Sequence, residues 1–249
     1  NHEHDKLLQV IGQFNYLDIC IKIIPDMYEA ITGQVSIDTI RGLPLLNINP
    51  DIITEYQIFI KRIGDILISS VALILLFPLN IIIGLFIKLN SKGDILYTQK
   101  RLGLNEKEFI LIKFRTMYSD SEKETGPIWA EKDDPRITTV GRILRKYHLD
   151  EIPQLFNVIL GEMSIIGPRP ERPEIISRIM NEIPYYSRRN KVKPGITGWA
   201  QIKGAYDGSL TDVENKLKHD FYYIENMSLL LDVKIIFITL IVVLKGKGH

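Results

Sequence analysis

A run of 22 residues, Ile66 to Ile87, carries no charged side chain, and it constrains the fold more than any other feature of the sequence. As a straight helix it would be about 33 Å long, enough to cross the apolar core of a bilayer of about 30 Å. A buried helix of a soluble protein is the alternative, but uncharged runs in such helices are usually shorter. More than 60 residues precede the run and no small-residue cleavage site follows it, so it is not a signal peptide. The sequence therefore predicts contact with a membrane.

Pro78 lies inside this run, where it removes a backbone donor and frees the carbonyl of Ile74. A helix broken there has two arms of about 11 residues, each about 17 Å long, so neither arm reaches the far leaflet. Basic residues, which mark the cytoplasmic side, stand at both ends of the run: Lys61, Arg62, Lys88 and Lys92. These patterns predict a re-entrant hairpin with both ends in the cytoplasm. A tilted, kinked helix that spans the bilayer is the alternative.

The run divides the chain into three predicted regions: residues 1–50, 51–92 and 93–249. The first has the pattern of a remnant of an α/β domain, with helix-like segments at 6–14 and 26–32 and strand-like segments at 18–24, 35–37 and 43–48. Because the chain begins with Asn1 rather than Met, we expect that upstream sequence has been lost. The expected fold class is α+β: a mainly helical catalytic domain with a small β element and a Pro-broken re-entrant membrane helix, preceded by that remnant.

Composition and local charge narrow the possible partners. The chain has 31 Lys and Arg against 30 Asp and Glu, a net charge of +1 that gives no reason to expect nucleic-acid binding. The single cysteine, Cys20, cannot form an internal disulfide, which favours a reducing cytoplasmic setting. Residues 88–118 and 169–193 nevertheless each hold seven basic and three acidic residues. Beside a membrane segment, such clusters suggest binding of anionic headgroups or phosphates, although most of their members have the pattern of a solvated face.

The acidic pair Asp150-Glu151 precedes a segment with helical apolar spacing, and Pro153 beside it fits only in a first helical turn. We therefore expect the pair at the N-terminus of a helix that ends at Gly161. Free N–H groups and the helix macrodipole at such a position favour the carboxylate form. Acidic residues at helix starts are also common caps, so the pattern alone leaves a catalytic and a capping role open.

Three basic residues stand out because their neighbours are apolar or rigid. Lys113 and Arg115 lie in Phe109–Met117, whose β-branched and aromatic content predicts a strand. Arg169 lies between two prolines, and a guanidinium held in such a stiff stretch suits a bidentate grip on a phosphate. A simple surface turn is the alternative for Arg169. We expect these three residues to neutralise phosphate charge.

Several motifs now appear in one order along the chain. They are KFRTM at 113–117, DPRIT at 134–138, GRILR at 141–145, LDEIPQ at 149–154, GPRP at 167–170 and VKPGITGWAQ at 192–201. With Lys61, Arg62 and Asp65 before the Pro-broken apolar run, the region Lys61 to Leu244 resembles the bacterial sugar transferase family, the membrane phosphoglycosyl transferases of the re-entrant (monotopic) type. Residues 1–50 resemble the end of the Rossmann-type domain that precedes the transferase module in longer members.

The resemblance implies transfer of a sugar 1-phosphate from a UDP-sugar to polyprenyl (undecaprenyl) phosphate with release of UMP, as the first membrane step of exopolysaccharide, capsule or O-antigen assembly. It implies that Asp150 is the nucleophile that carries the sugar phosphate covalently, and that Glu151, with Asp150, ligates Mg²⁺. Asp220 falls in a family-like stretch, where a contact with metal or nucleotide and a structural role are both open.

The resemblance also implies a location at the bacterial inner membrane, with the catalytic domain on the cytoplasmic face and membrane lipids as partners; a homodimer is left open. The ten apolar residues Ile235–Leu244 are too few to span a bilayer and suit a helix lying in its interface. Two other functions are weighed: a non-enzymatic module that binds anionic lipid through the basic clusters, and a transporter fragment, for which a second spanning helix is missing.

Overall fold

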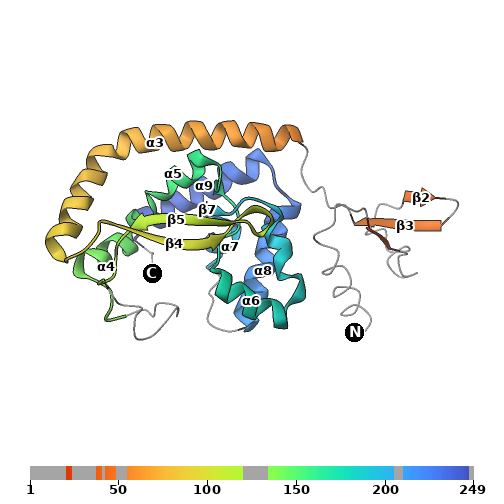
Figure 1. Cartoon of the computed structure of the whole chain (residues 1–249). Coiled ribbons are helices and arrows are strands. Elements are labelled where there is room, and N and C mark those ends of the chain that lie inside the picture. The colour runs from red at the N-terminus through yellow and green to blue at the C-terminus, as the bar shows by residue number, and fades with distance from the viewer. Residues whose placement is uncertain are drawn as a thin grey trace.

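The computed structural model describes residues 21–23, 38–40, 43–48, 55–119, 134–204 and 210–246. Figure 1 shows a mainly helical unit with small sheets, crossed along its top by one long helix, as the expected fold class requires. After the long helix α3 (Glu55–Asn90), the elements are β4 (Leu96–Leu102), η1 (Leu104–Glu106), β5 (Glu108–Phe114), α4 (Thr139–Lys146), η2 (Leu149–Glu151), α5 (Gln154–Leu160), β6 (Ser164–Ile166), α6 (Pro173–Glu182), η3 (Pro184–Lys191), β7 (Gly195–Thr197), α7 (Trp199–Ile202), α8 (Leu210–Glu225) and α9 (Leu229–Leu244).

The N-terminal region contributes three short strands, β1 (Ile21–Ile23), β2 (Asp38–Ile40) and β3 (Leu43–Ile48), in the order β1-β3-β2. The strand predicted at 43–48 is confirmed, and β1 lies within the one predicted at 18–24. Both pairings are antiparallel, so the described strands do not show the parallel pairing of a Rossmann-type sheet. The helices predicted at 6–14 and 26–32 and the strand predicted at 35–37 lie outside the described residues.

The prediction of a helix broken at Pro78 is wrong in one respect, because α3, which is 36 residues long in total, continues through this residue. Figure 1 shows that α3 bends in its second half, the half that contains Pro78. A proline removes one backbone hydrogen bond and its ring displaces the preceding turn, which kinks a helix when the flanking residues still favour it. Long apolar side chains on both sides of Pro78 supply that preference, so the helix bends and does not stop.

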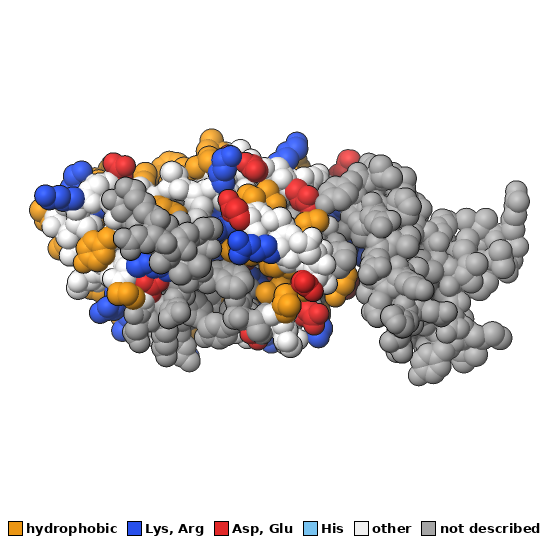
Figure 2. Space-filling model, turned by 60° about the horizontal axis from the view of Figure 1, so that its bottom comes forward, with side chains coloured by type: hydrophobic (Ala, Val, Ile, Leu, Met, Phe, Trp, Pro, Cys, Tyr) orange, Lys and Arg blue, Asp and Glu red, His pale blue; other side chains and the backbone are white. Residues whose placement is uncertain are grey.

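Most apolar side chains of α3 remain outside the protein. Ile74, Leu75 and Leu89 are 73%, 71% and 75% exposed, and only 11% of the most apolar window of the helix is buried. A core helix of a soluble protein would be mostly buried, so that alternative does not fit this helix. In the described part of the chain, α3 is the one helix long and apolar enough to cross a membrane. By contrast, the face brought forward in Figure 2 shows basic and acidic side chains close together.

Polar side chains near the start of α3 fix it to the remainder of the protein. Lys61 Nζ forms an ion pair with Asp232 in α9, with an N–O distance of 2.6 Å. Arg62 donates to the carbonyls that end α5, and Asp65 accepts from the backbone N–H of Ile165 in β6 at 3.2 Å. These bonds join α3 to three separate elements of the rest of the protein: α9, α5 and β6.

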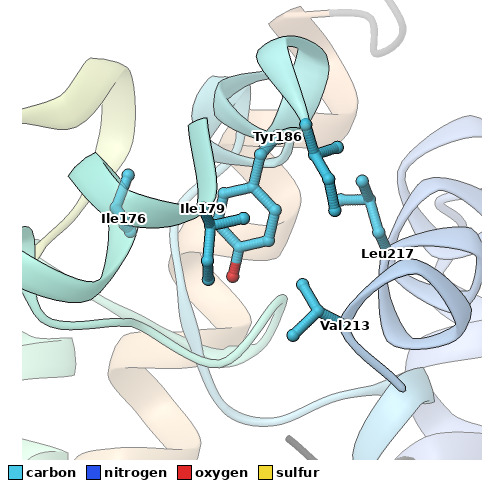
Figure 3. Close-up of a cluster of buried hydrophobic side chains, with 6 residues drawn as sticks. Ile176, Ile179, Tyr186, Val213 and Leu217 are labelled. Atoms are coloured by element: carbon cyan, nitrogen blue, oxygen red, sulfur yellow. The ribbon is translucent and has the colours of Figure 1, made fainter. Parts of the chain in front are cut away.

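The second half of α3 joins the protein through an apolar cluster. Ile83 and Ile87 are buried against Phe114, Leu144 and Ile152. These three partners belong to the end of β5, to α4 and to the turn before α5, so α3 packs against elements next to the acidic pair. A separate core joins α6, η3 and α8, and Figure 3 shows its members Ile176, Ile179, Tyr186, Val213 and Leu217.

Two small sheets complete the unit. Strands β4 and β5 form an antiparallel hairpin with Tyr97 opposite Lys113, and β6 and β7 pair in parallel. The strand predicted at Phe109–Met117 is therefore confirmed as β5, but β5 ends at Phe114. Asn157 of α5 fixes the hairpin to that helix, because its side-chain amide bonds the backbone of Ile110 and Ile112 at 2.7 and 3.1 Å.

Candidate active site

The acidic pair lies in η2, a single 3₁₀ turn between α4 and α5. Asp150 and Glu151 are buried, with 7% and 9% of their surface exposed. The helix predicted to start at the pair begins later, at Gln154, because Pro153 has no N–H to donate back to the carbonyl of Leu149 in an α-helical bond. The predicted stop is confirmed: Gly161 ends α5 with a left-handed φ of +90°.

Three cations act on this pair. Arg169 Nη2 lies 2.7 Å from Glu151 Oε1 and forms an ion pair with it. Lys113 and Arg145 are close enough to Asp150 to lower the pKa of its carboxyl, as Arg169 also does. Arg145 is held by a bond from its Nε to Thr116 Oγ1 at 3.0 Å.

The two carboxyl groups differ in how well their charge is stabilised. Burial raises the pKa of Asp150, and the neighbouring charge of Glu151 raises it further, against the opposing effect of the three cations. Burial would also raise the pKa of Glu151, but the charge and hydrogen bond of Arg169 lower it below its ordinary value. The negative charge of Glu151 is therefore better compensated than that of Asp150.

Burial also changes the pKa of one of the cations that act on Asp150. It lowers the pKa of Lys113 to about 8, although the charge of Asp150 opposes the shift and Arg145 adds to it. Lys113 Nζ lies 5.3 Å from the ring centroid of Tyr97, its partner across the hairpin. The ammonium group thus has an aromatic face on one side and the acidic pair on the other.

Asp220, for which a contact with metal or nucleotide and a structural role were both open, pairs with a cation outside this group of charges. It lies in α8, 2% exposed, and pairs with Arg189 at 2.8 Å. Arg189 in turn donates to the backbone carbonyl of Arg169 at 2.9 Å. Asp220 therefore supports the backbone that carries Arg169, which agrees with the structural alternative for this residue.

Arg115, also predicted to neutralise phosphate charge, has hydrogen-bond partners in another part of the protein. Its guanidinium donates to the carbonyl and the hydroxyl of Ser91, both at 2.9 Å, and so caps the loop after α3. Lys113 lies within β5, whereas Arg115 follows the last strand residue, Phe114. The two basic residues thus have different partners: Lys113 acts on Asp150, whereas Arg115 bonds Ser91.

Arg145 is the cation that the sequence interpretation missed. It lies in the last turn of α4, five residues before Asp150, within the motif at 141–145. Nothing in that motif distinguishes Arg145 from Arg142, since only the packing of α4 against β5 decides which arginine faces the acidic pair.

Mg²⁺ is the metal that the sequence resemblance implies for this pair. Among the described residues, no group of three or more Asp, Glu, His or Cys side chains gathers as a complete metal site. Mg²⁺ commonly takes only one or two protein carboxylates and completes its shell with phosphate oxygens and water. Two adjacent buried carboxylates therefore fit a metal that arrives with a diphosphate substrate.

The family model described as bacterial sugar transferase matches residues 56–246. The chain belongs to this family. The resemblance inferred from the motifs is thereby confirmed, and the matched region contains the acidic pair, its three cations and all of α3 except its first residue.

Curated relatives agree with the family. The chain is 42% identical over 225 residues to a UDP-N-acetylgalactosamine-undecaprenyl-phosphate N-acetylgalactosaminephosphotransferase of Aeromonas hydrophila, covering 90% of this chain and 52% of the relative. It is 35% identical over 236 residues to a UDP-glucose:undecaprenyl-phosphate glucose-1-phosphate transferase of Escherichia coli, covering 94% and 51%. It is 39% identical over 198 residues to the exopolysaccharide production protein PSS of Rhizobium leguminosarum, covering 77% and 99%. The chain thus spans about half the length of the first two relatives.

Proposed function

We propose that the chain is the catalytic part of an enzyme that transfers a sugar 1-phosphate from a UDP-sugar to undecaprenyl phosphate, with release of UMP. The observation that carries the proposal is the buried pair Asp150-Glu151, surrounded by Lys113, Arg145 and Arg169 and packed against an exposed apolar helix. The names of two relatives, which specify UDP-sugars and undecaprenyl phosphate, support it. The name of a third supports a place in exopolysaccharide production.

The proposed reaction has two phosphoryl-transfer steps. A carboxylate oxygen of Asp150 attacks the β-phosphorus of the UDP-sugar, and the bond to the bridging oxygen breaks, so that UMP leaves with the electron pair. A phosphate oxygen of undecaprenyl phosphate then attacks the same phosphorus, and the released Asp150 carboxylate is ready for the next cycle. The sugar 1-phosphate is conserved throughout and ends in a diphosphate link to the lipid.

The cations explain why an anion can attack another anion in this scheme. Lys113, Arg145 and Arg169 offset the negative charge that accumulates on phosphate oxygens, a contribution that is largest in a buried site. Glu151, with Asp150, would hold Mg²⁺, which supplies further neutralisation of the diphosphate when bound. Because Arg169 already binds Glu151, its guanidinium is oriented toward the place where the phosphates arrive.

The proposed location is the cytoplasmic face of the bacterial inner membrane, with α3 inserted as a bent, re-entrant helix. Exposed apolar side chains of α9 support a second contact, because they recur every three or four residues along one face: Leu230, Val233, Phe237, Leu240 and Leu244 are 56–85% exposed. Near them, Trp199 stacks on Tyr222, and the ammonium groups of Lys203 and Lys234 lie 4.8 and 5.5 Å from its ring. This combination of aromatic and basic groups is typical of the headgroup region.

A covalent adduct provides the direct test. The protein is incubated with a UDP-sugar and Mg²⁺ but without lipid acceptor, and the peptide that contains Asp150 is examined by mass spectrometry. We expect the mass of one sugar phosphate on Asp150 and release of an equal amount of UMP. Normal turnover in Asp150→Asn would contradict the covalent route. We expect this variant to lose activity while its association with membranes is unchanged, which would show that the loss of activity is not a loss of binding to lipid.

A further inference from the structure

Strand β4 presents two different faces. Tyr97, Gln99 and Arg101 are half-buried, whereas the intervening Thr98 and Lys100 are exposed. Since side chains alternate along a strand, the first three share the face that is turned toward the catalytic unit. Tyr97, Gln99 and Arg101 are called the β4 row below.

Hydrogen bonds connect the members of the β4 row to one another. Gln99 Nε2 donates to the Tyr97 hydroxyl at 3.1 Å, and Arg101 Nη2 donates to Gln99 Oε1 at 2.8 Å. The orientation of the Gln99 amide is thereby fixed, with its nitrogen toward Tyr97 and its oxygen toward Arg101. Fixed side chains of this kind lose little conformational entropy when they bind a ligand.

Both ends of the β4 row lead to the acidic pair. At one end the Tyr97 ring lies 5.3 Å from Lys113 Nζ, and Lys113 acts on Asp150. At the other end Arg101 Nη1 donates to the carbonyl of Pro170 at 3.1 Å, directly after Arg169, which binds Glu151. Each end of the β4 row is therefore linked to a cation that acts on the acidic pair, Lys113 at one end and Arg169 at the other.

The side chains linked in this way fall into charged and uncharged groups. The lysine, the arginines and the carboxylates suit phosphate groups and a metal ion. The Tyr97 ring and hydroxyl and the Gln99 amide are uncharged, and they offer a flat apolar face beside a donor and an acceptor. This combination suits the uncharged hydroxyl groups and the C–H face of a sugar.

We propose that Tyr97 and Gln99 bind the sugar of the UDP-sugar and help to select it. The proposal rests on the function proposed above, in which Asp150 attacks the β-phosphorus. The sugar is bonded directly to that phosphate, whereas the uracil is separated from it by the ribose and the α-phosphate. Because Tyr97 adjoins Lys113, and Lys113 acts on Asp150, the nearest uncharged part of the substrate is the sugar.

The test compares Gln99→Ala and Tyr97→Phe with Lys100→Ala, a control on the exposed face of the same strand. Lys100 pairs only at the surface, with Glu108, so its loss changes little. We measure kcat/KM for several UDP-sugars with undecaprenyl phosphate, and inhibition by UMP. Loss of one hydrogen bond predicts a decrease of about two- to tenfold for the preferred sugar, with a changed ranking of sugars and unchanged inhibition by UMP.

Thermal unfolding of each variant identifies any loss of fold, and Tyr97→Phe removes only one hydroxyl, so at least one variant remains informative. An equal decrease in kcat/KM for every sugar, together with weaker inhibition by UMP, would assign the β4 row to the nucleotide and overturn the proposal. Unchanged kcat/KM in both variants would also overturn it. If instead the unmodified protein transfers no sugar phosphate, or Asp150→Asn still transfers it, the proposed function fails and not only the role of the β4 row.

Discussion

Asp150 and Glu151 are adjacent in sequence, yet their surroundings prepare them for different tasks. Arg169 binds Glu151 directly and lowers the pKa of its carboxyl, so Glu151 remains charged and fixed in position. Asp150 is influenced by cations from three different segments, and burial still raises the pKa of its carboxyl. One residue thus anchors the charges of the site, and the other keeps the reactivity that the proposed attack requires.

The pH dependence of the reaction should reflect Lys113. The pKa of Lys113 is lowered to about 8 by burial, so its ammonium group loses the proton as the pH rises through that value. If the charged form neutralises phosphate, kcat/KM decreases above about pH 8 in a pH–rate profile. Lys113→Arg carries a charge that persists at these pH values, so this decrease should disappear, although the altered shape lowers the rate at every pH. An unchanged alkaline decrease in Lys113→Arg would assign it to another group.

Arg145 and Arg115 should behave in opposite ways when they are truncated. Arg145→Ala removes a cation near Asp150, and we expect kcat/KM to fall by about 100-fold with little change in the unfolding temperature. Arg115→Ala instead leaves the carbonyl of Ser91 without its partner, which costs about 1–3 kcal/mol of stability. The fraction of Arg115→Ala that remains folded should keep its activity. A loss of activity without loss of stability in Arg115→Ala would restore the role predicted from the sequence.

The sequence alone indicated the surroundings of some charged residues and not of others, and the difference has physical reasons. Arg169 was identified because two prolines restrict its backbone, which is a local property. The bonds of Arg115 to Ser91 were not predicted, because they depend on how the loop after α3 returns to the end of β5. Asp220 and Arg145 depend on contacts between helices distant in sequence, and periodicity along one helix does not reveal which distant charge it meets.

At the level of elements, the approach of α4 to the end of β5 determines where Arg145 lies. A Cβ atom added to Gly141 would lie 2.0 Å from the carbonyl oxygen of Thr116, so only glycine permits this approach. Thr116 also accepts the hydrogen bond that holds Arg145. The same close contact therefore serves packing and the site.

Gly141→Ala should accordingly impair both stability and turnover. The backbone of α4 must shift to accept the methyl group, at a cost of about 1–3 kcal/mol, and Arg145 moves with it. Gly64→Ala is the matched control, because a Cβ there meets no atom within 4 Å and alanine is favoured inside a helix by about 0.5–1 kcal/mol. Thermal unfolding and kcat/KM are measured for both variants. Equal stability of the two would show that α4 does not depend on this contact.

Prediction of the elements succeeded where the signal is local. Strand β5 and the stop at Gly161 follow from β-propensity and from backbone conformation. The continuous course of α3 through Pro78 was not predicted, because a proline in a long apolar segment can bend a helix as well as break it. The later start of α5 reflects one missing N–H at Pro153, which moves a helix boundary by a few residues.

For the molecule as a whole, the apolar row of α9 offers a test of membrane contact that leaves α3 intact. Leu230 and Phe237 are 85% and 66% exposed, so Leu230→Gln with Phe237→Gln should hardly change stability. Because each large apolar side chain contributes about 1.5–3 kcal/mol when it leaves water, we expect vesicle binding to weaken about tenfold or more. Leu210→Gln, which changes an exposed leucine of α8, is the control. Equal sedimentation of all three proteins with vesicles would exclude α9 from the interface.

The burial of Ile83 and Ile87 against Ile152 gives α3 two duties at once. Its outer apolar side chains, such as Ile74 and Leu75, remain exposed, whereas its inner ones pack beside the turn that carries Asp150 and Glu151. A change in how α3 is seated would therefore be felt directly at the acidic pair.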